Sequence, residues 1–264
     1  MDRIIGSKKS PPSDNKTAVL LIHGILDCSV TWLLTGPGKG LGVAVQSLPV
    51  SVRLGNNVTR TMVCNLACDP LQNQQLLLEE KSWHEIGIYD LPAMIDHIIE
   101  QTKQEKIFMV THSQGGAAFF VMASERPEYQ EKVIAFSALA PAVFMSRTGT
   151  SLFRMLCLVA DSNSLQLTLN LLGIYQFKPL GTFLRTLGKI VCSEQSLLLP
   201  VCKGVFDLAF GYDGNLNAST LRLVSQYAPA GASIRQFAHY GQSILSGKFR
   251  KFDYGVAGNM KNYG

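Results

Sequence analysis

The 264-residue sequence predicts an α/β fold in which a mainly parallel sheet is followed by a mostly helical insertion. Short apolar runs at 18–22, 107–110 and 133–139 predict strands, and the continuous run at 18–22 is typical of a strand buried on both faces of a parallel sheet. Between strands, apolar residues recur at helical spacing, and the order strand, helix, strand implies right-handed crossovers between parallel strands. Hydrophobic residues make up 47% of the chain, which is sufficient for one large domain core.

Changes in residue pattern divide the chain into an extended polar arm (1–16), a core of strands and helices (17–141), a mostly helical insertion (142–250), called the cap below, and a last segment (251–264). The arm has no apolar segment typical of a signal peptide. The chain also has no run of about 18 apolar residues that could span a membrane. We therefore expect no transmembrane segment.

The first apolar run, at 18–22, is followed by His23, Gly24 and Ile25. A glycine just past a central strand lets the backbone turn, which leaves the N–H of Ile25 facing the crevice at the carboxyl end of the sheet. In a serine hydrolase, this N–H would be one donor of the oxyanion hole, the set of donors that stabilises a tetrahedral intermediate. His23 itself is interpreted as a structural, hydrogen-bonded histidine.

The middle of the core contains one further strand and one helix. A second strand is predicted at 50–54. The next twenty or so residues show neither the alternation of a strand nor the spacing of a helix, and they are interpreted as a loop. Asp90 and Pro92 predict a helix start, because an aspartate can cap a helix and a proline fits its first turn. Apolar residues at helical spacing then extend from Leu91 to Ile99.

The central feature is the segment 107–118, where an apolar run ends at Ser113 and helical spacing of apolar residues begins directly afterwards. This pattern predicts a strand, a tight turn and a helix, a geometry that lifts the serine hydroxyl clear of the sheet. Ser113 is therefore the candidate nucleophile, and the N–H of Gln114 is the second candidate oxyanion donor. Thr111 replaces the first glycine of the usual G-x-S-x-G pattern, and its branched side chain is expected to crowd the turn. The alternative is an ordinary loop serine before a surface helix.

The cap is predicted from apolar residues at helical spacing in 183–191, 202–209 and 234–245. Apolar helices above a serine crevice could form a lid for an apolar substrate, but ordinary helix packing produces the same periodicity. One stretch fits strand alternation as well as a helix; it contains Leu165, Leu167, Leu169 and Leu171.

Charge and cysteine content limit the classes of function. Lysine and arginine (24) exceed the acidic residues (19) only modestly and are mostly scattered, so a solvated basic face is favoured over a nucleic-acid groove. Cys64 and Cys68 lack the second Cys/His pair of a zinc site. Cys192 and Cys202 close a short loop that would suit a disulfide in an oxidising compartment. Three N-glycosylation triplets indicate the same compartment; they begin at Asn15, Asn57 and Asn217. With no signal peptide visible, these features predict that the front of the chain is missing.

With these segments placed, the sequence resembles the animal acid lipase family, the α/β-hydrolases that include gastric and lysosomal acid lipases. The matching stretches occur in family order along nearly the whole chain. They include His23-Gly24-Ile25-Leu26-Asp27, Ser82-Trp83-His84-Glu85-Ile86-Gly87, His112-Ser113-Gln114-Gly115, Ala138-Leu139-Ala140-Pro141, Pro229-Ala230-Gly231-Ala232-Ser233 and Phe252-Asp253-Tyr254-Gly255.

The resemblance implies hydrolysis of carboxylic esters of lipids, either triacylglycerols or sterol esters, in lipid catabolism. It implies Ser113 as nucleophile, the Ile25 and Gln114 N–H groups as oxyanion donors, and no cofactor. It also implies peripheral contact with a lipid surface, a lysosomal or secreted location, and no nucleic-acid partner. It assigns 17–141 as a partial core, 142–250 as a cap and 251–264 as the start of a return to the core. Within the cap it implies a disulfide between Cys192 and Cys202 and a glycan on Asn217; Asn57 is a further glycosylation candidate.

Departures from the family concern the catalytic acid and base. The chain stops at Gly264, where family members continue into two more strands that carry the aspartate and the histidine, so we expect an α/β-hydrolase fold lacking its C-terminal strands. His239 is the only histidine after Ser113, and it matches a cap position of the family. Without base and acid, a serine is a weak nucleophile. Three hypotheses follow: a lipase-type hydrolase of doubtful activity as given, a non-catalytic lipid-binding protein, and an incomplete gene model of an active secreted enzyme.

Overall fold

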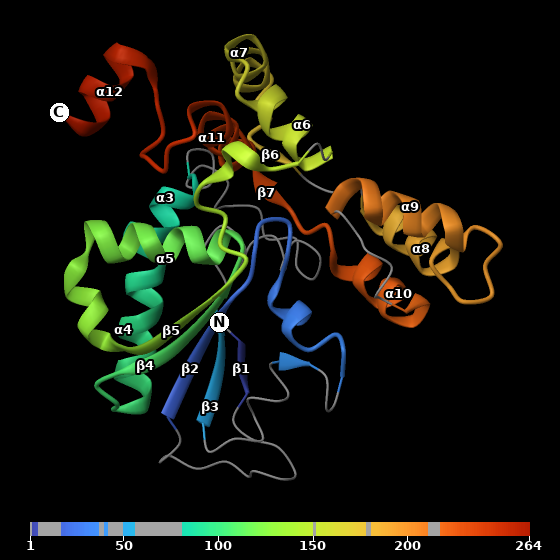
Figure 1. Cartoon of the computed structure of the whole chain (residues 1–264), viewed down its shortest axis with the longest axis horizontal. Helices are drawn as coiled ribbons and strands as arrows, with labels where there is room; N and C mark the ends of the chain where they lie inside the picture. Colours follow the sequence, from blue (N-terminus) through green and yellow to red (C-terminus); the bar gives the residue numbers. More distant parts are fainter. Residues whose placement is uncertain are drawn as a thin grey trace.

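The computed structural model describes residues 2–4, 17–36, 40–41, 50–55, 81–149, 152–177, 181–210 and 217–264. Its main element is a five-stranded sheet (Figure 1). In spatial order, the strands are β1 (Asp2–Ile4), β3 (Val50–Gly55), β2 (Thr17–Ile22), β4 (Ile107–His112) and β5 (Val133–Leu139).

Strands β2 to β5 are parallel, as the sequence predicts, and β1 pairs antiparallel with β3 at one edge. The three apolar runs and the predicted 50–54 strand therefore all form strands of this sheet. Residues 2–4 of the expected arm are part of the sheet, whereas 5–16 and the expected loop after residue 55, up to residue 80, lie outside the described residues.

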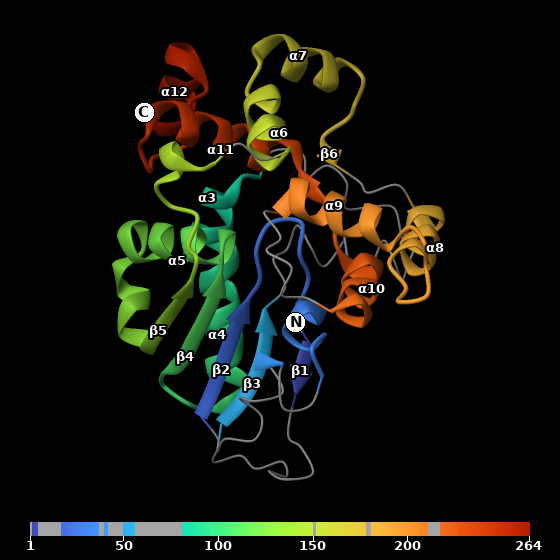
Figure 2. The same ribbon diagram turned by 45° about the vertical axis from the view of Figure 1, so that its right-hand side comes forward.

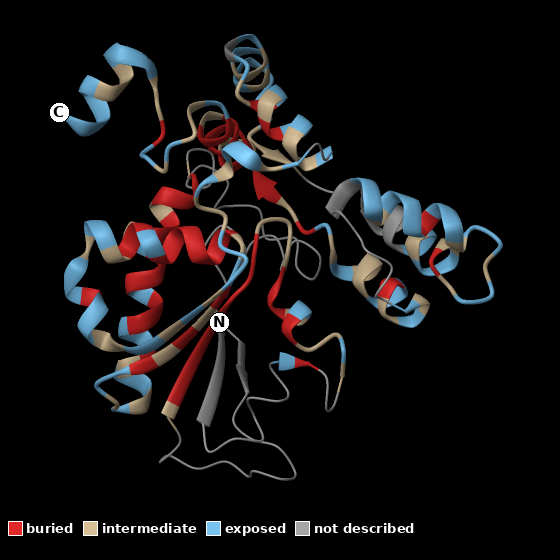
Figure 3. Cartoon of the chain, viewed as in Figure 1, coloured by how far each residue is buried: buried red, intermediate tan, exposed pale blue. Residues whose placement is uncertain are grey.

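Both faces of the central strands are covered. On one face, α4 (Leu91–Thr102) and α5 (Gln114–Glu125) pack against alternate residues of β2 and β4, including Leu20 and Met109. On the other face, Leu21 packs with Trp32 of the short helix η1 (Ser29–Trp32). In Figure 3, most of β2 and parts of α4 and α5 are coloured as buried. Burial on both faces explains why these strands are continuous apolar runs instead of alternating ones.

The helix before β4 starts earlier than the sequence predicts. It begins at α3 (Trp83–Glu85), continues through the π-helix η3 (Ile86–Asp90) and becomes α4 without a break. Asp90 has helical backbone angles and makes no capping hydrogen bond, so the predicted cap there is wrong. The cap is Ser82, whose hydroxyl accepts from the His84 N–H, while the Glu85 carboxylate accepts from the Ser82 N–H. This reciprocal pair is a capping box.

The cap is mostly helical and lies beyond the carboxyl ends of the strands (Figure 2). The four leucines at 165–171 form a helix, which resolves the open alternative. The remaining elements are η4 (Pro127–Lys132), η5 (Met145–Arg147), α6 (Leu152–Ala160), α7 (Asn163–Leu171), β6 (Gln176–Phe177), α8 (Gly181–Val191), α9 (Leu199–Phe210), α10 (Ala218–Tyr227), β7 (Ala232–Ser233), α11 (Ile234–Ser246) and α12 (Gly255–Tyr263).

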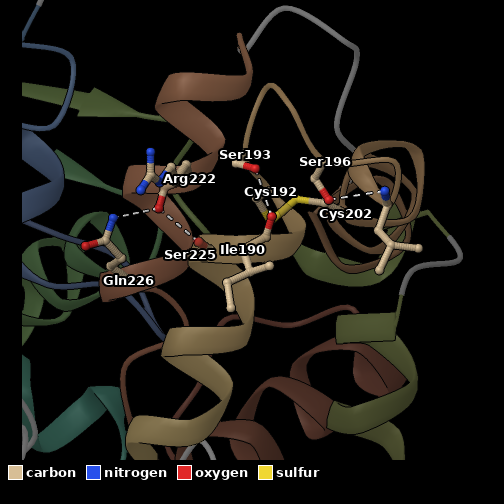
Figure 4. The surroundings of a disulfide bond; sticks show 9 residues. Ile190, Cys192, Ser193, Ser196, Cys202, Arg222, Ser225 and Gln226 are labelled. Carbon is tan, nitrogen blue, oxygen red and sulfur yellow. Dashed lines mark hydrogen bonds between the residues drawn. A yellow bond between two sulfur atoms is a disulfide. The ribbon is translucent and has the colours of Figure 1, made fainter.

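A disulfide joins Cys192, just after α8, to Cys202 in α9 (Figure 4). Both cysteines are buried and pack with Leu221 of α10, so the bond is part of a small apolar cluster that holds three cap helices together. The pairing implied by the family resemblance is thus present in the structure.

Replacing Cys192 and Cys202 together with alanine should lower the free energy of unfolding of the cap by about 3 kcal/mol, because a cross-link across ten residues removes conformational entropy from the unfolded chain. Urea unfolding followed by circular dichroism measures this loss. Wild-type protein treated with a reductant is the matched control and should behave like the double variant. Equal urea midpoints for the oxidised wild type and the variant would show that the bond does not stabilise the cap.

Asn217 is exposed and caps α10, with its side-chain oxygen accepting from the Thr220 N–H at 2.8 Å. Glycosylation modifies the side-chain nitrogen, so this contact leaves the expected glycan position open to solvent. The candidates Asn15 and Asn57 lie outside the described residues, as do Cys64 and Cys68. None of the helices in the described ranges is sufficiently long and apolar to cross a membrane.

Candidate active site

Ser113 lies at the turn between β4 and α5, as the sequence predicts. Its backbone angles, φ 50° and ψ −113°, are unusual for a residue with a side chain. The turn is fixed from both sides: the Ser113 N–H donates to the Leu139 carbonyl at 2.9 Å, and the Ser113 carbonyl accepts from Gly116 at 3.0 Å and Ala142 at 3.2 Å. A serine in this strained strand-to-helix turn is the geometry of a nucleophile elbow.

Two glycines allow the helix to approach the sheet this closely. A β-carbon on Gly115 would lie 2.7 Å from the side chain of Ile22, and one on Gly116 would lie 2.7 Å from Pro141. Thr111, at the position where glycine is usual, is fully buried, its hydroxyl has no hydrogen-bond partner among the described residues, and the elbow forms with this side chain in place. The threonine is therefore compatible with the elbow.

The two candidate oxyanion donors come from adjacent strands. β2 and β4 are paired, with Ile22 opposite Thr111, so the turns that follow them meet at the same edge of the sheet. A β-carbon on Gly24 would lie 3.0 Å from the β-carbon of Ser113, which shows that the turn containing Ile25 lies directly against the serine. Within the described part of the chain, the N–H groups of Ile25 and Gln114 have no hydrogen-bond partner. Such free donors beside a serine hydroxyl are what an oxyanion hole requires.

A general base for Ser113 is not found among the five histidines of the chain. Ser113 Oγ makes no hydrogen bond with any described residue. The His23 ring bonds the Gly24 carbonyl at 2.7 Å, in agreement with the structural role expected for it. His239 is fully buried, with one ring nitrogen 3.0 Å from Ser82 Oγ and the other 2.9 Å from the Arg250 carbonyl. Both nitrogens of His239 are therefore engaged away from Ser113, and a catalytic role for it is excluded in this arrangement.

A second group of serine, histidine and carboxylate lies at the start of α3. Ser82 Oγ is 3.0 Å from His239 Nδ1 and donates to Glu85 Oε2 at 2.7 Å. The order of contacts differs from that of a catalytic triad, because the carboxylate bonds the serine and not the histidine. Ser82 is also completely buried. We interpret this group as a structural connection between α3 and α11, and the Trp83 ring stacks on His239 within it.

Comparisons with known proteins show the family of the chain. Lipase 3 of Drosophila melanogaster is 35% identical over all of this chain, which covers 66% of that protein. The lysosomal acid lipase/cholesteryl ester hydrolase of Macaca fascicularis is 32% identical over 98% of this chain, which covers 62% of that protein. The human gastric triacylglycerol lipase is 32% identical over 95% of this chain, which covers 61% of that protein. The chain belongs to the animal acid lipase family. It spans about two thirds or less of the length of these relatives, and no family model matches it.

Membership of this family, together with the parallel sheet of the structure, confirms the expected α/β-hydrolase fold. Solved structures are similar at a lower level. An epoxide hydrolase from Bacillus megaterium has a TM-score of 0.43 at 16% identity, over 90% of this chain and 72% of that one. A monoacylglycerol lipase from Paleococcus ferrophilus has a TM-score of 0.36 at 16% identity, over 94% and 72%. The family assignment does not depend on these low scores.

Burial and local polar contacts together set the protonation of His239 and Glu85, the two titratable residues beside Ser82. Burial lowers the pKa of His239 to about 4, although the hydrogen bond to the Arg250 carbonyl and the nearby Glu85 carboxylate oppose this shift. Burial alone would raise the pKa of Glu85, but the adjacent His84 ring and the two hydrogen bonds from Ser82 outweigh it and lower this pKa to about 2. At neutral pH, the group therefore consists of a neutral histidine and a charged carboxylate.

Proposed function

We propose that the protein hydrolyses carboxylic esters of lipids through an acyl-enzyme formed on Ser113. Ser113 Oγ would attack the ester carbonyl carbon, the carbonyl electrons would move to its oxygen, and the Ile25 and Gln114 N–H groups would stabilise that oxyanion. The proton of the serine hydroxyl would pass to the alcohol as it leaves, and water would then attack the acyl-enzyme, releasing the fatty acid and returning a proton to the serine oxygen. The elbow at Ser113, in direct contact with the turn that contains Ile25, is the observation that carries this proposal.

Triacylglycerols and sterol esters are the proposed substrates, since relatives are named as a triacylglycerol lipase and a cholesteryl ester hydrolase. Contact with a lipid surface is supported by large apolar side chains exposed on the cap, among them Met155, Leu171, Leu197 and Leu208, with Leu197 97% exposed. Side chains of this kind are energetically unfavourable in water and favour an apolar surface. The disulfide and the names of the relatives support a secreted or lysosomal location.

The Ser113 hydroxyl has no base among the described residues, and this observation favours a second candidate function, lipid binding without turnover. The two functions differ in product formation. On emulsified triolein or cholesteryl oleate, the first predicts a slow release of fatty acid that free imidazole accelerates, because imidazole in solution can take the serine proton. Binding to the emulsion with no release of fatty acid, with or without imidazole, would favour the second function.

A further inference from the structure

Two hydrogen bonds connect the segment 230–236, where the chain enters α11, to the turns that contain the candidate oxyanion donors. The Ala230 N–H donates to the Leu26 carbonyl at 2.7 Å, and Leu26 directly follows Ile25. The side-chain amide of Gln114 donates to Gln236 Oε1 at 3.2 Å. One short segment of the chain therefore contacts both halves of the proposed oxyanion hole.

The bond between Gln114 and Gln236 is buried. Gln114 is 2% and Gln236 3% exposed, and their positions are 122 residues apart in the sequence. The Gln114 side-chain oxygen has no partner among the described residues, so within this part of the chain Gln236 alone orients the Gln114 amide. Exchanging oxygen and nitrogen on both amides preserves the bond, so the pairing does not depend on how the amides are assigned.

The surroundings of this bond are apolar. Phe237 and Tyr240 of α11 belong to the same buried cluster as Ala117 and Val121 of α5. In such surroundings, an amide that loses its partner is costly, because water does not replace the lost bond. The Gln114 side chain is thus held in one orientation, and Gln114 is also the first residue of α5, so its backbone N–H has no acceptor within that helix.

The backbone on the Ile25 side is fixed in a comparable way. Leu26 has a φ of 59°, a left-handed conformation that is unfavourable for a branched residue. The bond from Ala230 to the Leu26 carbonyl stabilises this conformation and with it the direction of the preceding Ile25 N–H. Both donors therefore depend on the same segment for their positions.

We propose that Gln236 is a positioning residue for the oxyanion hole: together with Ala230 it sets the separation of the Ile25 and Gln114 N–H groups. The segment 230–236, which belongs to the cap, would in this way affect the reactivity of Ser113. This inference rests on the proposed function of Ser113, and it adds a residue that does not touch the reacting atoms.

The test compares Gln236→Leu with Gln242→Leu on the whole 264-residue chain. Gln242 is a matched control, because it lies on the same helix and bonds the backbone of Asp253, away from α5. The probe is an alkyl fluorophosphonate, whose phosphoryl oxygen would occupy the oxyanion hole when it reacts with serine. Reactions are run with free imidazole at several probe concentrations, which separates the maximal rate of labelling from the concentration that gives half of it.

For Gln236→Leu we expect the maximal labelling rate to fall about tenfold, with the half-saturating concentration changed less than twofold, because binding is kept and stabilisation of the developing charge is weakened. Gln236→Asn, which keeps a shorter amide, should lie between the wild type and the leucine variant. It also keeps the test valid if Gln236→Leu does not fold. Gln242→Leu should label like the wild type.

Each other outcome overturns the inference. If the wild type is labelled at Ser113 and both Gln236 variants react like Gln242→Leu, the positioning role is wrong and the proposed function stands. If Gln236→Leu changes only the half-saturating concentration, Gln236 acts on probe binding instead. If the wild type shows no labelling that depends on Ser113, the proposed function fails and the positioning role fails with it.

Discussion

Replacing Ser113 with alanine should abolish the ester hydrolysis that free imidazole stimulates, a loss of roughly a hundredfold or more. The physical reason is that no acyl-enzyme forms without the hydroxyl, and imidazole in solution then has no nucleophile to activate. The rate of fatty acid release from triolein is measured at several imidazole concentrations, and the slope of this rate against imidazole concentration is compared between the wild type and Ser113→Ala. The wild type should show a rate that rises with imidazole, and Ser113→Ala a rate equal to that of imidazole alone.

The alanine variant should remain folded, because Ser113 Oγ makes no hydrogen bond with a described residue and the positive φ is equally unfavourable for both residues. Its free energy of unfolding should stay within about 1 kcal/mol of the wild type. An imidazole-dependent rate that is the same in both proteins would show that hydrolysis occurs elsewhere.

Acid should destabilise the protein through His239. Its pKa, lowered by burial to about 4 in the folded protein, compares with 6.5 for an exposed histidine. Between these values, the unfolded chain binds the proton and the folded protein does not. The contribution of the neutral His239 to the free energy of unfolding is therefore fully present above pH 6.5 and is lost as the pH falls toward 4. The shift corresponds to about 3 kcal/mol. The lowered pKa of Glu85 acts in a lower window, between pH 4.5 and about 2.

Urea unfolding at pH 7, 5.5 and 4 measures this dependence. His239→Gln keeps a donor and an acceptor but does not titrate, so this variant should lose most of the pH dependence between pH 7 and 4. His97→Gln is the control, because His97 is exposed on α4 and should leave the dependence unchanged. Parallel pH curves for the wild type and His239→Gln would contradict a buried neutral histidine.

Much of the core follows from local patterns in the sequence. The run before Ser113 and the helical spacing after it predict the elbow correctly, because strand, turn and helix are all encoded within a dozen residues. The helix before β4 shows where such patterns are insufficient. Asp90 and Pro92 resemble a helix start, but Ser82 and Glu85 form a capping box eight residues earlier, and the chain is already helical at Asp90. Two start signals compete there, and spacing alone does not decide between them.

The contacts between the cap and the core could not be predicted in this way. His239 pairs with Ser82 across 157 residues, and Gln236 pairs with Gln114 across 122. Both polar residues lie on a helix whose apolar stripe is visible in the sequence, but periodicity does not reveal which buried group satisfies a polar side chain. The sequence does contain the Ser82–Glu85 pair at capping-box spacing, which could have located the true helix start.

The most direct test of the central claim is to find where a fluorophosphonate binds covalently. The 264-residue chain is reacted with the probe in the presence of imidazole and digested, and the modified peptide is sequenced by tandem mass spectrometry. The account predicts a single adduct on Ser113, in the peptide that joins β4 to α5, and no adduct in Ser113→Ala. An adduct on another serine, or equal labelling of both proteins, would contradict it.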